Sequence, residues 1–303
     1  MDQIVKIINV FQSISKYLIS IRIWQWLKNL IVFTLPIGFG TSNFGLLLKV
    51  LQSFFGLSLL SSSIYIINDI KDINSDQNHP FKKNRPIASG KLSINKARSY
   101  LIFLLIAGLS ILLLINLNTF IVGSIYFICG FLYTYLFKYI RHIDSFMISF
   151  LFVIRLLIGS FAVNIQPSSS LIIFITLFSF SLSVSKRISI LLNKNISEKS
   201  RYKEFLIKSY EVEKLKNVLR VSLALSNLVY FFWVISKFST FQFNISNLFL
   251  LISVVTMSRV LYGIYRLTIT SGLEDFVLSV IKSRIDLSYI IFTVSLTILG
   301  IYW

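Results

Sequence analysis

Long apolar runs alternate with polar segments along the whole of this 303-residue sequence. Each run holds about 18–24 residues, enough for an α-helix to cross a hydrocarbon core of roughly 30 Å. Nine runs are expected to span, at roughly 22–40, 45–67, 97–116, 118–137, 144–163, 169–186, 217–236, 244–267 and 286–302. The pattern predicts an all-α fold, a polytopic membrane helical bundle of about nine transmembrane helices forming a single domain over residues 1–303.

The first 20 residues have a different pattern. Apolar side chains recur there at helical spacing, with lysines and amides between them, at Ile4, Ile7, Ile8, Phe11, Ile14 and Leu18. This arrangement is typical of an amphipathic helix lying in the membrane interface, so residues 1–20 are predicted to form one.

Composition supports the membrane class. Charged residues make up 14% of the chain, whereas a soluble domain carries roughly a quarter. The net charge of +18 does not indicate nucleic-acid binding, because the lysines and arginines are gathered in the loops between the apolar runs. The single cysteine, Cys129, lies within an apolar run and is given no role.

The basic residues also predict the orientation of the chain. They concentrate in the connections at 68–96, 138–143, 187–216 and 268–285, while the other connections are short and almost uncharged. The positive-inside rule then places the N-terminus and these loops in the cytoplasm, and the C-terminus on the other side.

The loop at 68–96 carries the strongest chemical signal. If the preceding helix continues to about residue 76, Asp69, Asp72 and Asp76 share one face at i, i+3 and i+7. Clustered carboxylates repel unless a cation lies among them, and Mg²⁺ prefers such oxygen ligands together with substrate phosphates. The alternative is a solvated acidic helix end. Because three of only twelve acidic residues fall on this short face, we favour a catalytic magnesium site.

Basic residues follow directly after the aspartates. Lys82, Lys83 and Arg85 are suited to bind phosphate oxygens, with arginine able to do so through two parallel hydrogen bonds. The segment 68–96 is therefore predicted to be an Asp-rich cytoplasmic catalytic loop that binds a diphosphate.

Residues 68–90 resemble a known signature. The run N-D-x-x-D-x-x-x-D followed by R-P-x-A-S-G is similar to the first motif of the UbiA superfamily of intramembrane prenyltransferases. The inserted H-P-x-K-x-x-R-P-I-A-S-G resembles one branch, the decaprenyl-phosphate phosphoribosyltransferases. The resemblance implies that Asn68 also belongs to the substrate site.

Two further segments support the same branch. The run Arg22 to Asn29 resembles R-P-x-Q-W-x-K-N, with Ile23 in place of the proline, and Lys28 and Asn29 are expected to face a polar cavity. The stretch from Tyr133 to Lys138, followed by Asp144, resembles Y-S-x-x-L-K followed by Asp. Ring-prenylating members typically carry a second pair of aspartates here, whereas this chain has Asp144 alone.

Basic residues inside the spans complete the predicted site. Arg155 lies deep in an apolar run, where an arginine indicates either a functional site or a structural pair with a neighbouring helix. Lys186 and Arg187 match a Lys-Arg pair of the branch, with snorkelling as the alternative. For Arg259, Tyr262 and Arg266, snorkelling at the cytoplasmic helix end is at least as good an interpretation as ligand binding.

By resemblance, the chain transfers 5-phosphoribose from phosphoribosyl diphosphate to a polyprenyl phosphate with Mg²⁺, releasing diphosphate for cell-envelope glycan synthesis. The implied setting is the bacterial plasma (inner) membrane. The predicted catalytic residues are Asp69, Asp72, Asp76 and Asp144, of which the first three bind the metal. Lys28, Lys138, Arg155 and Lys186 are candidates for the acceptor phosphate. The alternatives are a prenyltransferase that uses a polyprenyl diphosphate and an aromatic acceptor, and a non-enzymatic polyprenyl-lipid transporter.

Overall fold

The computed structural model describes residues 15–38, 43–194, 196, 200–238, 244–270, 279–280 and 282–302. Helices are the regular elements in these ranges, and no strand occurs among the residues they contain. Most of the predicted interfacial helix lies outside the described residues, which begin with a helical stretch at 15–20. There Tyr17 packs edge-on against Tyr100, with the ring centroids 4.9 Å apart.

Eight helices of the described chain are long and apolar enough to cross a membrane. They are α3 (Phe44–Lys71), α5 (Ile94–Ile115), α6 (Leu117–Tyr135), α7 (Ile143–Val163), α8 (Ser169–Leu192), α10 (Val212–Ile235), α11 (Ile245–Thr270) and α13 (Arg284–Tyr302). Each coincides with one of the predicted spans to within a few residues, and the all-helical membrane fold is confirmed.

The remaining predicted span, 22–40, is the first along the chain, and it is not a continuous α-helix. It begins as the 3₁₀ helix η1 (Ile23–Phe33) and continues as α2 (Thr34–Gly38). At about 2.0 Å per residue for a 3₁₀ helix and 1.5 Å for an α-helix, the two together rise about 30 Å. The segment is therefore long enough to cross the hydrocarbon core with fewer residues than an α-helix needs.

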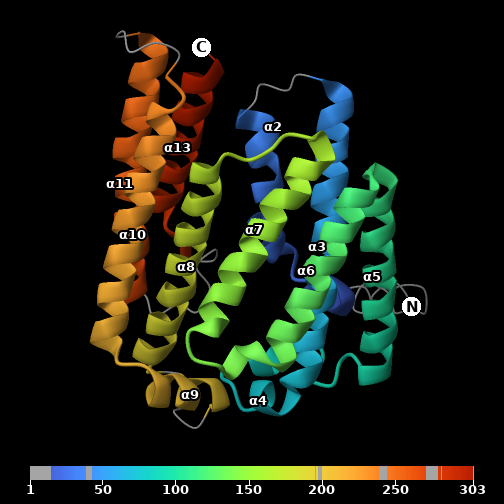
Figure 1. Cartoon of the computed structure of the whole chain (residues 1–303). Helices are drawn as coiled ribbons and strands as arrows, with labels where there is room; N and C mark the ends of the chain where they lie inside the picture. The colour runs from blue at the N-terminus through green and yellow to red at the C-terminus, as the bar shows by residue number, and fades with distance from the viewer. Residues whose placement is uncertain are drawn as a thin grey trace, which may run out of the picture.

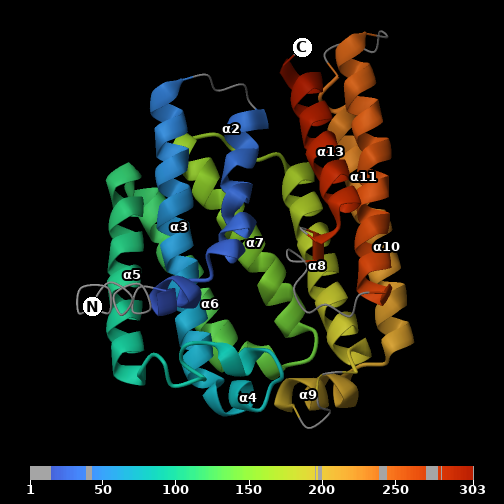
Figure 2. The ribbon, with the colours of Figure 1, turned by 180° about the vertical axis from the view of Figure 1, so that it is seen from behind.

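The long helices run side by side, and short helices lie at both ends of the bundle (Figure 1). The other short elements of the described ranges are α4 (Ile73–Gln77), η2 (Lys82–Asn84), η3 (Phe137–Tyr139) and α9 (Arg201–Ser209). Both α4 and α9 lie at the same end of the bundle in the two opposite views (Figures 1 and 2). We refer to it as the α4/α9 end.

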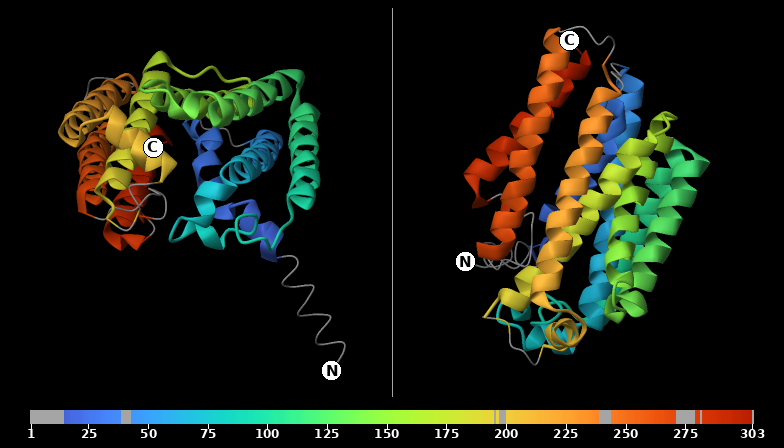
Figure 3. Two further views of the ribbon diagram at one scale, coloured as in Figure 1. Left: turned by 90° about the horizontal axis from the view of Figure 1, so that it is seen from below. Right: turned by 60° about the vertical axis from the view of Figure 1, so that its left-hand side comes forward.

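Helix packing divides the bundle into two groups joined in the middle. The most extensive contacts are between α3 and α5, α11 and α13, and α8 and α10, while α7 packs against both α3 and α8. Seen from the α4/α9 end, α3 lies inside the arc formed by α5, α6 and α7 (Figure 3). Segment η1 packs on α3 and α7, so the first span lies against the centre of the bundle.

Apolar side chains cover much of the outer surface of the spans, and polar side chains are buried together with the apolar core. On α3, Ser58, Ser61, Ser62 and Ser63 are buried. On α5, by contrast, Phe103 and Leu114 are 64% and 81% exposed. Such large exposed apolar side chains along the helices match a protein whose outer surface contacts lipid.

Glycines allow the closest helix contacts. A Cβ atom added to Gly159 of α7 would lie 2.3 Å from the backbone oxygen of Val32, so only glycine admits η1 at this distance. Similarly, a Cβ on Gly108 of α5 would lie 2.8 Å from the oxygen of Gly56 in α3. The position of η1 in the bundle therefore depends on a residue without a side chain.

Candidate functional site

The aspartate motif lies where the helical path from α3 bends. Helix α3 ends at Lys71, and Asp72 has φ −94° and ψ 10°, outside the regular helical values. Helical hydrogen bonding nevertheless continues across the bend, because Asp72 N–H donates to Asn68 O at 2.9 Å and Asp76 N–H to Asp72 O at 2.8 Å. The three carboxylates thus stand on successive turns, but not on one straight helix.

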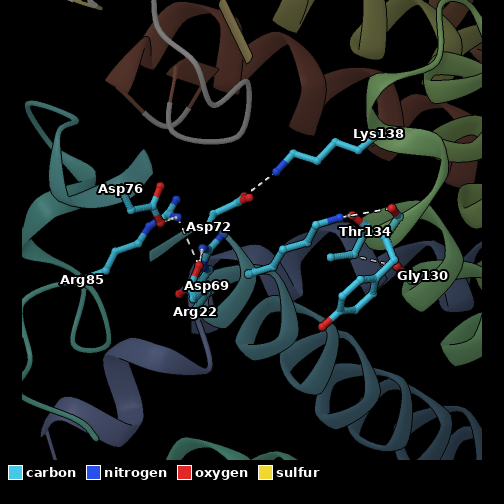
Figure 4. A network of polar contacts seen from close by, with 10 residues as sticks. Arg22, Asp69, Asp72, Asp76, Arg85, Gly130, Thr134 and Lys138 are labelled. Carbon is cyan, nitrogen blue, oxygen red and sulfur yellow. Dashed lines mark hydrogen bonds and ion pairs between the residues drawn. The ribbon is translucent and has the colours of Figure 1, made fainter. Parts of the chain in front are cut away.

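Arginines neutralise two of the three carboxylates. Asp69 and Asp76 are only 3% and 4% exposed, and Nη1 of Arg85 contacts both, at 3.1 Å and 2.5 Å (Figure 4). Arg22 forms a second ion pair with Asp69. Arg22 has a positive φ of 51° at the start of η1, a conformation that an arginine rarely adopts and that accompanies its pairing with Asp69.

The third carboxylate faces a different partner. Asp72 pairs with Lys138 of η3, and the neighbouring Lys71 donates a hydrogen bond to the backbone oxygen of Thr134 (Figure 4). These contacts tie the end of α3 to the end of α6. The predicted single face of three carboxylates therefore divides into a pair around Arg85 and a separate Asp72, because the backbone bends at Asp72 itself.

The loop after α4 is shaped so that Arg85 returns to the aspartates. Nδ1 of His79 accepts hydrogen bonds from the backbone N–H groups of Phe81 and Lys82, both at 3.3 Å. Farther along, Gly90 takes a φ of 74°, and Leu92 N–H donates to Pro86 O at 2.8 Å. The signature residues His79, Pro86 and Gly90 thus fold the loop back upon itself.

Burial changes the acidity of the aspartate nearest the loop. It raises the pKa of the Asp76 carboxyl, and the nearby charge of Asp69 acts in the same direction. The guanidinium of Arg85 opposes both effects but does not cancel them. Ionising the Asp76 carboxyl therefore costs free energy, and a second cation near it would reduce that cost.

The donor atoms at this end fit a magnesium ion. The oxygens come from Asp69, Asp72 and Asp76, and the buried Oδ1 of Asn68 accepts no hydrogen bond from any residue that the structure describes. No group of three or more acidic, histidine or cysteine side chains in the described part of the chain is close enough to hold a metal. Mg²⁺, however, usually binds one or two protein carboxylates together with waters and phosphate oxygens. The residues therefore suit an ion that arrives with a phosphorylated ligand.

Asp144 and Arg187 form a buried ion pair between α7 and α8. Asp144 is 0% and Arg187 1% exposed, and Nε of Arg187 lies 2.9 Å from Oδ2 of Asp144. The guanidinium also donates to the backbone oxygen and the hydroxyl of Ser183, at 2.5 and 2.6 Å. Both residues were predicted to contact substrate, but here they bind each other, and their substrate roles stay predictions.

Tyrosines surround this pair and connect it to the aspartate motif. Tyr210 lies 3.4 Å from Oδ1 of Asp144, and burial raises the pKa of its hydroxyl, which stays a donor. Burial likewise raises the pKa of Tyr202 to about 12. Tyr202 packs against Tyr139, the residue after Lys138, with the centroids 6.1 Å apart. The α9 segment thus packs against η3, which carries Lys138, the partner of Asp72.

A third polar group lies inside the spans. Arg155 is 6% exposed and donates from Nε to Oδ1 of Asn29 at 3.1 Å and from Nη2 to the hydroxyl of Tyr126 at 2.9 Å. Asn29 in turn donates to the hydroxyls of Ser58 and Ser61, at 3.0 and 3.2 Å. The structure thus joins Asn29 and Arg155, which are far apart in the sequence.

The other predicted site residues are more dispersed. Lys28 and Tyr133 are half-buried on η1 and α6, Lys82 is half-buried on η2, and Lys83 and Lys186 are exposed. Their binding roles stay predictions. Arg22, which pairs with Asp69, and Lys71, which lies within the motif and donates to Thr134 O, were not predicted as site residues. Their distance from their partners along the chain hid these contacts.

The cluster at the C-terminal helices has a structural partner. Arg259 and Arg266 of α11 both pair with Asp286 of α13, at 3.4 and 2.7 Å. Tyr262, on the same helix, is 59% exposed. Both arginines therefore pair with a neighbouring helix, and Arg259 lies in the middle of α11 and not at its end.

Comparison with known proteins agrees with this architecture. A family model described as the UbiA prenyltransferase family matches residues 30–275. Among solved structures, a UbiA homolog from Archaeoglobus fulgidus, bound to GPP and Mg²⁺, superposes with a TM-score of 0.67 at 16% sequence identity, covering 93% of this chain and 99% of that one.

Two curated relatives match parts of the chain. An uncharacterized protein of Sinorhizobium fredii, y4nM, is 30% identical over 57% of this chain and 34% of its own length. A decaprenyl-phosphate phosphoribosyltransferase of Mycolicibacterium smegmatis is 29% identical over 74% of this chain and 71% of its own length. The first match thus spans about a third of that relative. With the family model covering most of the sequence and the fold shared along nearly its whole length, the chain belongs to the UbiA prenyltransferase family.

Proposed function

We propose that this protein transfers 5-phosphoribose from phosphoribosyl diphosphate to a polyprenyl phosphate, with Mg²⁺, and releases diphosphate. The observation that carries the proposal is the alternation of charges at the bend after α3. Three carboxylates, Asp69, Asp72 and Asp76, stand among three cations, Arg22, Arg85 and Lys138. A diphosphate complexed with a divalent cation offers both kinds of partner at once, since its oxygens suit the cations and its metal suits the carboxylates.

The aspartates and Asn68 would hold the metal, which supplies charge neutralisation on the diphosphate leaving group. Arg85 is placed to donate to diphosphate oxygens, because its guanidinium already lies between Asp69 and Asp76. Arg22 and Lys138 flank the same space and would stabilise the charge that develops as the bond to the sugar breaks. An acceptor phosphate is already an anion, so the reaction requires no strong general base.

Two observations favour this branch over prenyl transfer. The second charge cluster contains one carboxylate, Asp144, and it is fully engaged by Arg187. A second metal-bound pair of aspartates, as ring-prenylating members are expected to carry, has no counterpart among the described residues of that cluster. The relative of Mycolicibacterium smegmatis, matched over 74% of this chain, also bears the name decaprenyl-phosphate phosphoribosyltransferase.

The proposal includes an orientation. The α4/α9 end carries the loops at 68–96 and 187–216, which hold much of the basic charge, so it faces the cytoplasm in this proposal. Soluble phosphoribosyl diphosphate would reach the aspartates from that side, and the lipid acceptor would arrive from within the bilayer.

The test is diphosphate release by the protein purified in detergent. Release is expected to require phosphoribosyl diphosphate, Mg²⁺ and a polyprenyl phosphate together, and to be lost in Asp72→Ala. Glu204→Ala is the matched control, because Glu204 is an exposed acidic residue of α9 whose partner is the surface Lys208. Turnover of a polyprenyl diphosphate with an aromatic acceptor, and none with phosphoribosyl diphosphate, would replace the proposal by the prenyltransferase alternative.

A further inference from the structure

Arg155 carries a buried charge that no carboxylate of the described residues balances. Among those residues, two arginines are more than nine-tenths buried, Arg155 and Arg187. Arg187 pairs with the carboxyl group of Asp144, whereas the hydrogen-bond partners of Arg155 are the side chains of Asn29 and Tyr126, which are not acidic residues. An uncompensated cation within a membrane span is costly, and such residues commonly mark the path of a charged ligand.

The groups around Arg155 hold it in place without neutralising it. Its guanidinium lies 4.5 Å from the ring centroid of Phe152 and 5.1 Å from that of Tyr126, in cation–π contact with both. Its third nitrogen, Nη1, makes no hydrogen bond to any residue that the structure describes. The N–H groups of Nη1 are therefore available to donate to an additional hydrogen-bond acceptor.

Asn29 is fixed in the orientation that serves Arg155. Its amide nitrogen donates to Ser58 and Ser61 of α3, so its oxygen is turned toward Nε of Arg155. Gly159, one helical turn beyond Arg155, lets η1 approach α7 closely enough for this contact. Three spans thus cooperate to hold one guanidinium.

This group lies deeper in the bundle than the aspartates. Ser61 is eight residues before Asp69 on α3, a rise of about 12 Å along the helix axis. Long side chains on an α-helix lean toward its N-terminus, which for α7 lies at the α4/α9 end, so the side chain of Arg155 is expected to lean toward that end. One diphosphate does not span this distance, so the two groups suit two different anions with a sugar between them.

We propose that Arg155, with Asn29 and Tyr126, binds the phosphate monoester of the lipid acceptor. This inference rests on the proposed function, and it names the site of the second substrate. The same chemistry would also suit the 5-phosphate of the sugar donor. We assign the site to the lipid because it lies inside the spans, among buried apolar side chains such as Ile154 and Ile158, where a polyprenyl chain attached to the phosphate would be solvated.

In the transfer step, an oxygen of this bound phosphate attacks the C1 carbon of the ribose. The bond from C1 to the diphosphate oxygen breaks, and its electron pair leaves with the diphosphate at the aspartates. No proton is transferred, because the attacking oxygen is already anionic. Arg155 holds the acceptor phosphate between its guanidinium and the sugar, as proximity catalysis requires.

The first test separates the two phosphate sources by kinetics. Arg155→Gln is expected to raise the KM for polyprenyl phosphate roughly 10- to 100-fold, the loss of one or two hydrogen bonds to a charged group, with the KM for phosphoribosyl diphosphate nearly unchanged. Arg155→Lys should restore part of the affinity. The matched control is Arg220→Gln, because Arg220 also donates to a tyrosine hydroxyl, that of Tyr265 at 2.9 Å, but on the exposed side of α10. A rise in the KM for phosphoribosyl diphosphate instead would overturn the assignment to the lipid.

The second test does not depend on catalysis. Farnesyl phosphate, but not farnesol, should raise the melting temperature of the detergent-purified protein, and Arg155→Leu should abolish that rise. Without ligand, Arg155→Leu should be at least as stable as the original protein, since it removes an unbalanced buried charge. A lower ligand-free melting temperature with an intact farnesyl phosphate response would show a purely structural arginine. If Arg155→Leu does not fold, the same comparison with Arg155→Gln decides.

The two tests also separate this inference from the proposed function. An Arg155-dependent response to farnesyl phosphate without any phosphoribosyl transfer would retain the lipid-phosphate site and reject the proposed reaction. Phosphoribosyl transfer with unchanged kinetics in Arg155→Gln would retain the proposed reaction and reject the lipid-phosphate site.

Discussion

Replacing Arg187 by methionine tests whether the Asp144–Arg187 pair holds the two halves of the bundle together. The substitution would leave the carboxyl group of Asp144 0% exposed and without its main partner. Breaking one side of a buried ion pair costs about 3–5 kcal/mol of unfolding free energy, because the remaining charge is not solvated. For a protein of this size, the melting temperature should fall by roughly 10 °C.

The double variant Asp144→Asn with Arg187→Met gives the sharper comparison. Removing both charges also removes the unsolvated carboxylate, and the new amide side chain would keep hydrogen-bonding capacity toward Tyr210. Most of the lost stability should therefore return, as is common when a buried pair is replaced as a unit. Melting temperatures of the original protein, both single variants and the double variant, measured by tryptophan fluorescence in detergent, form the cycle.

Activity of the double variant then separates a structural from a catalytic Asp144. If the pair is structural, diphosphate release should recover together with the melting temperature. A stable but inactive double variant would instead support the predicted contact of Asp144 or Arg187 with substrate. The electrostatic reasoning fails if Arg187→Met alone leaves the melting temperature unchanged, or if the double variant is no more stable than the single.

Three further results are expected. Gly159→Ala should destabilise the protein by about 1–3 kcal/mol, as overpacking does, because the new Cβ would lie 2.3 Å from Val32 O. The control in the same melting assay is Gly45→Ala, whose Cβ would meet only a side-chain oxygen. Arg85→Ala should lower kcat/KM for the diphosphate substrate roughly 10- to 100-fold through lost charged hydrogen bonds, and an unchanged value in steady-state kinetics would remove Arg85 from the site. Chelation with EDTA should abolish diphosphate release, reversibly with Mg²⁺, and should lower the melting temperature only slightly, because Arg22 and Arg85 already offset part of the charge of the buried carboxylates.

The sequence was most informative where one physical requirement acts on every residue of a segment. A membrane span must be apolar along about 20 residues, so eight of the nine spans could be located from hydrophobicity alone. The first span shows the limit of this reasoning. Its apolar length predicted a crossing, but not a 3₁₀ helix, since η1 is tied into the bundle by contacts such as those of Asn29 with α3 and of Val32 with Gly159.

The aspartate motif likewise has one feature that the sequence predicted and one that it did not. The spacing of Asp69, Asp72 and Asp76 predicted carboxylates on successive turns, which the structure has. The spacing did not predict the bend at Asp72, which directs that side chain to Lys138. The direction of a side chain at a helix end depends on the neighbouring element, here η3, and not on helical periodicity.

By itself, then, the sequence determined the membrane class, the approximate spans, the family resemblance and the residue types at the charged end of the bundle. Only the tertiary structure decided which charged and polar side chains meet. Arg22 with Asp69, Arg187 with Asp144 and Arg155 with Asn29 are each separated by more than 40 residues along the chain. The physical reason is that ion pairing is set by distance in space, and in a helical bundle helix packing brings together side chains that sequence periodicity cannot relate.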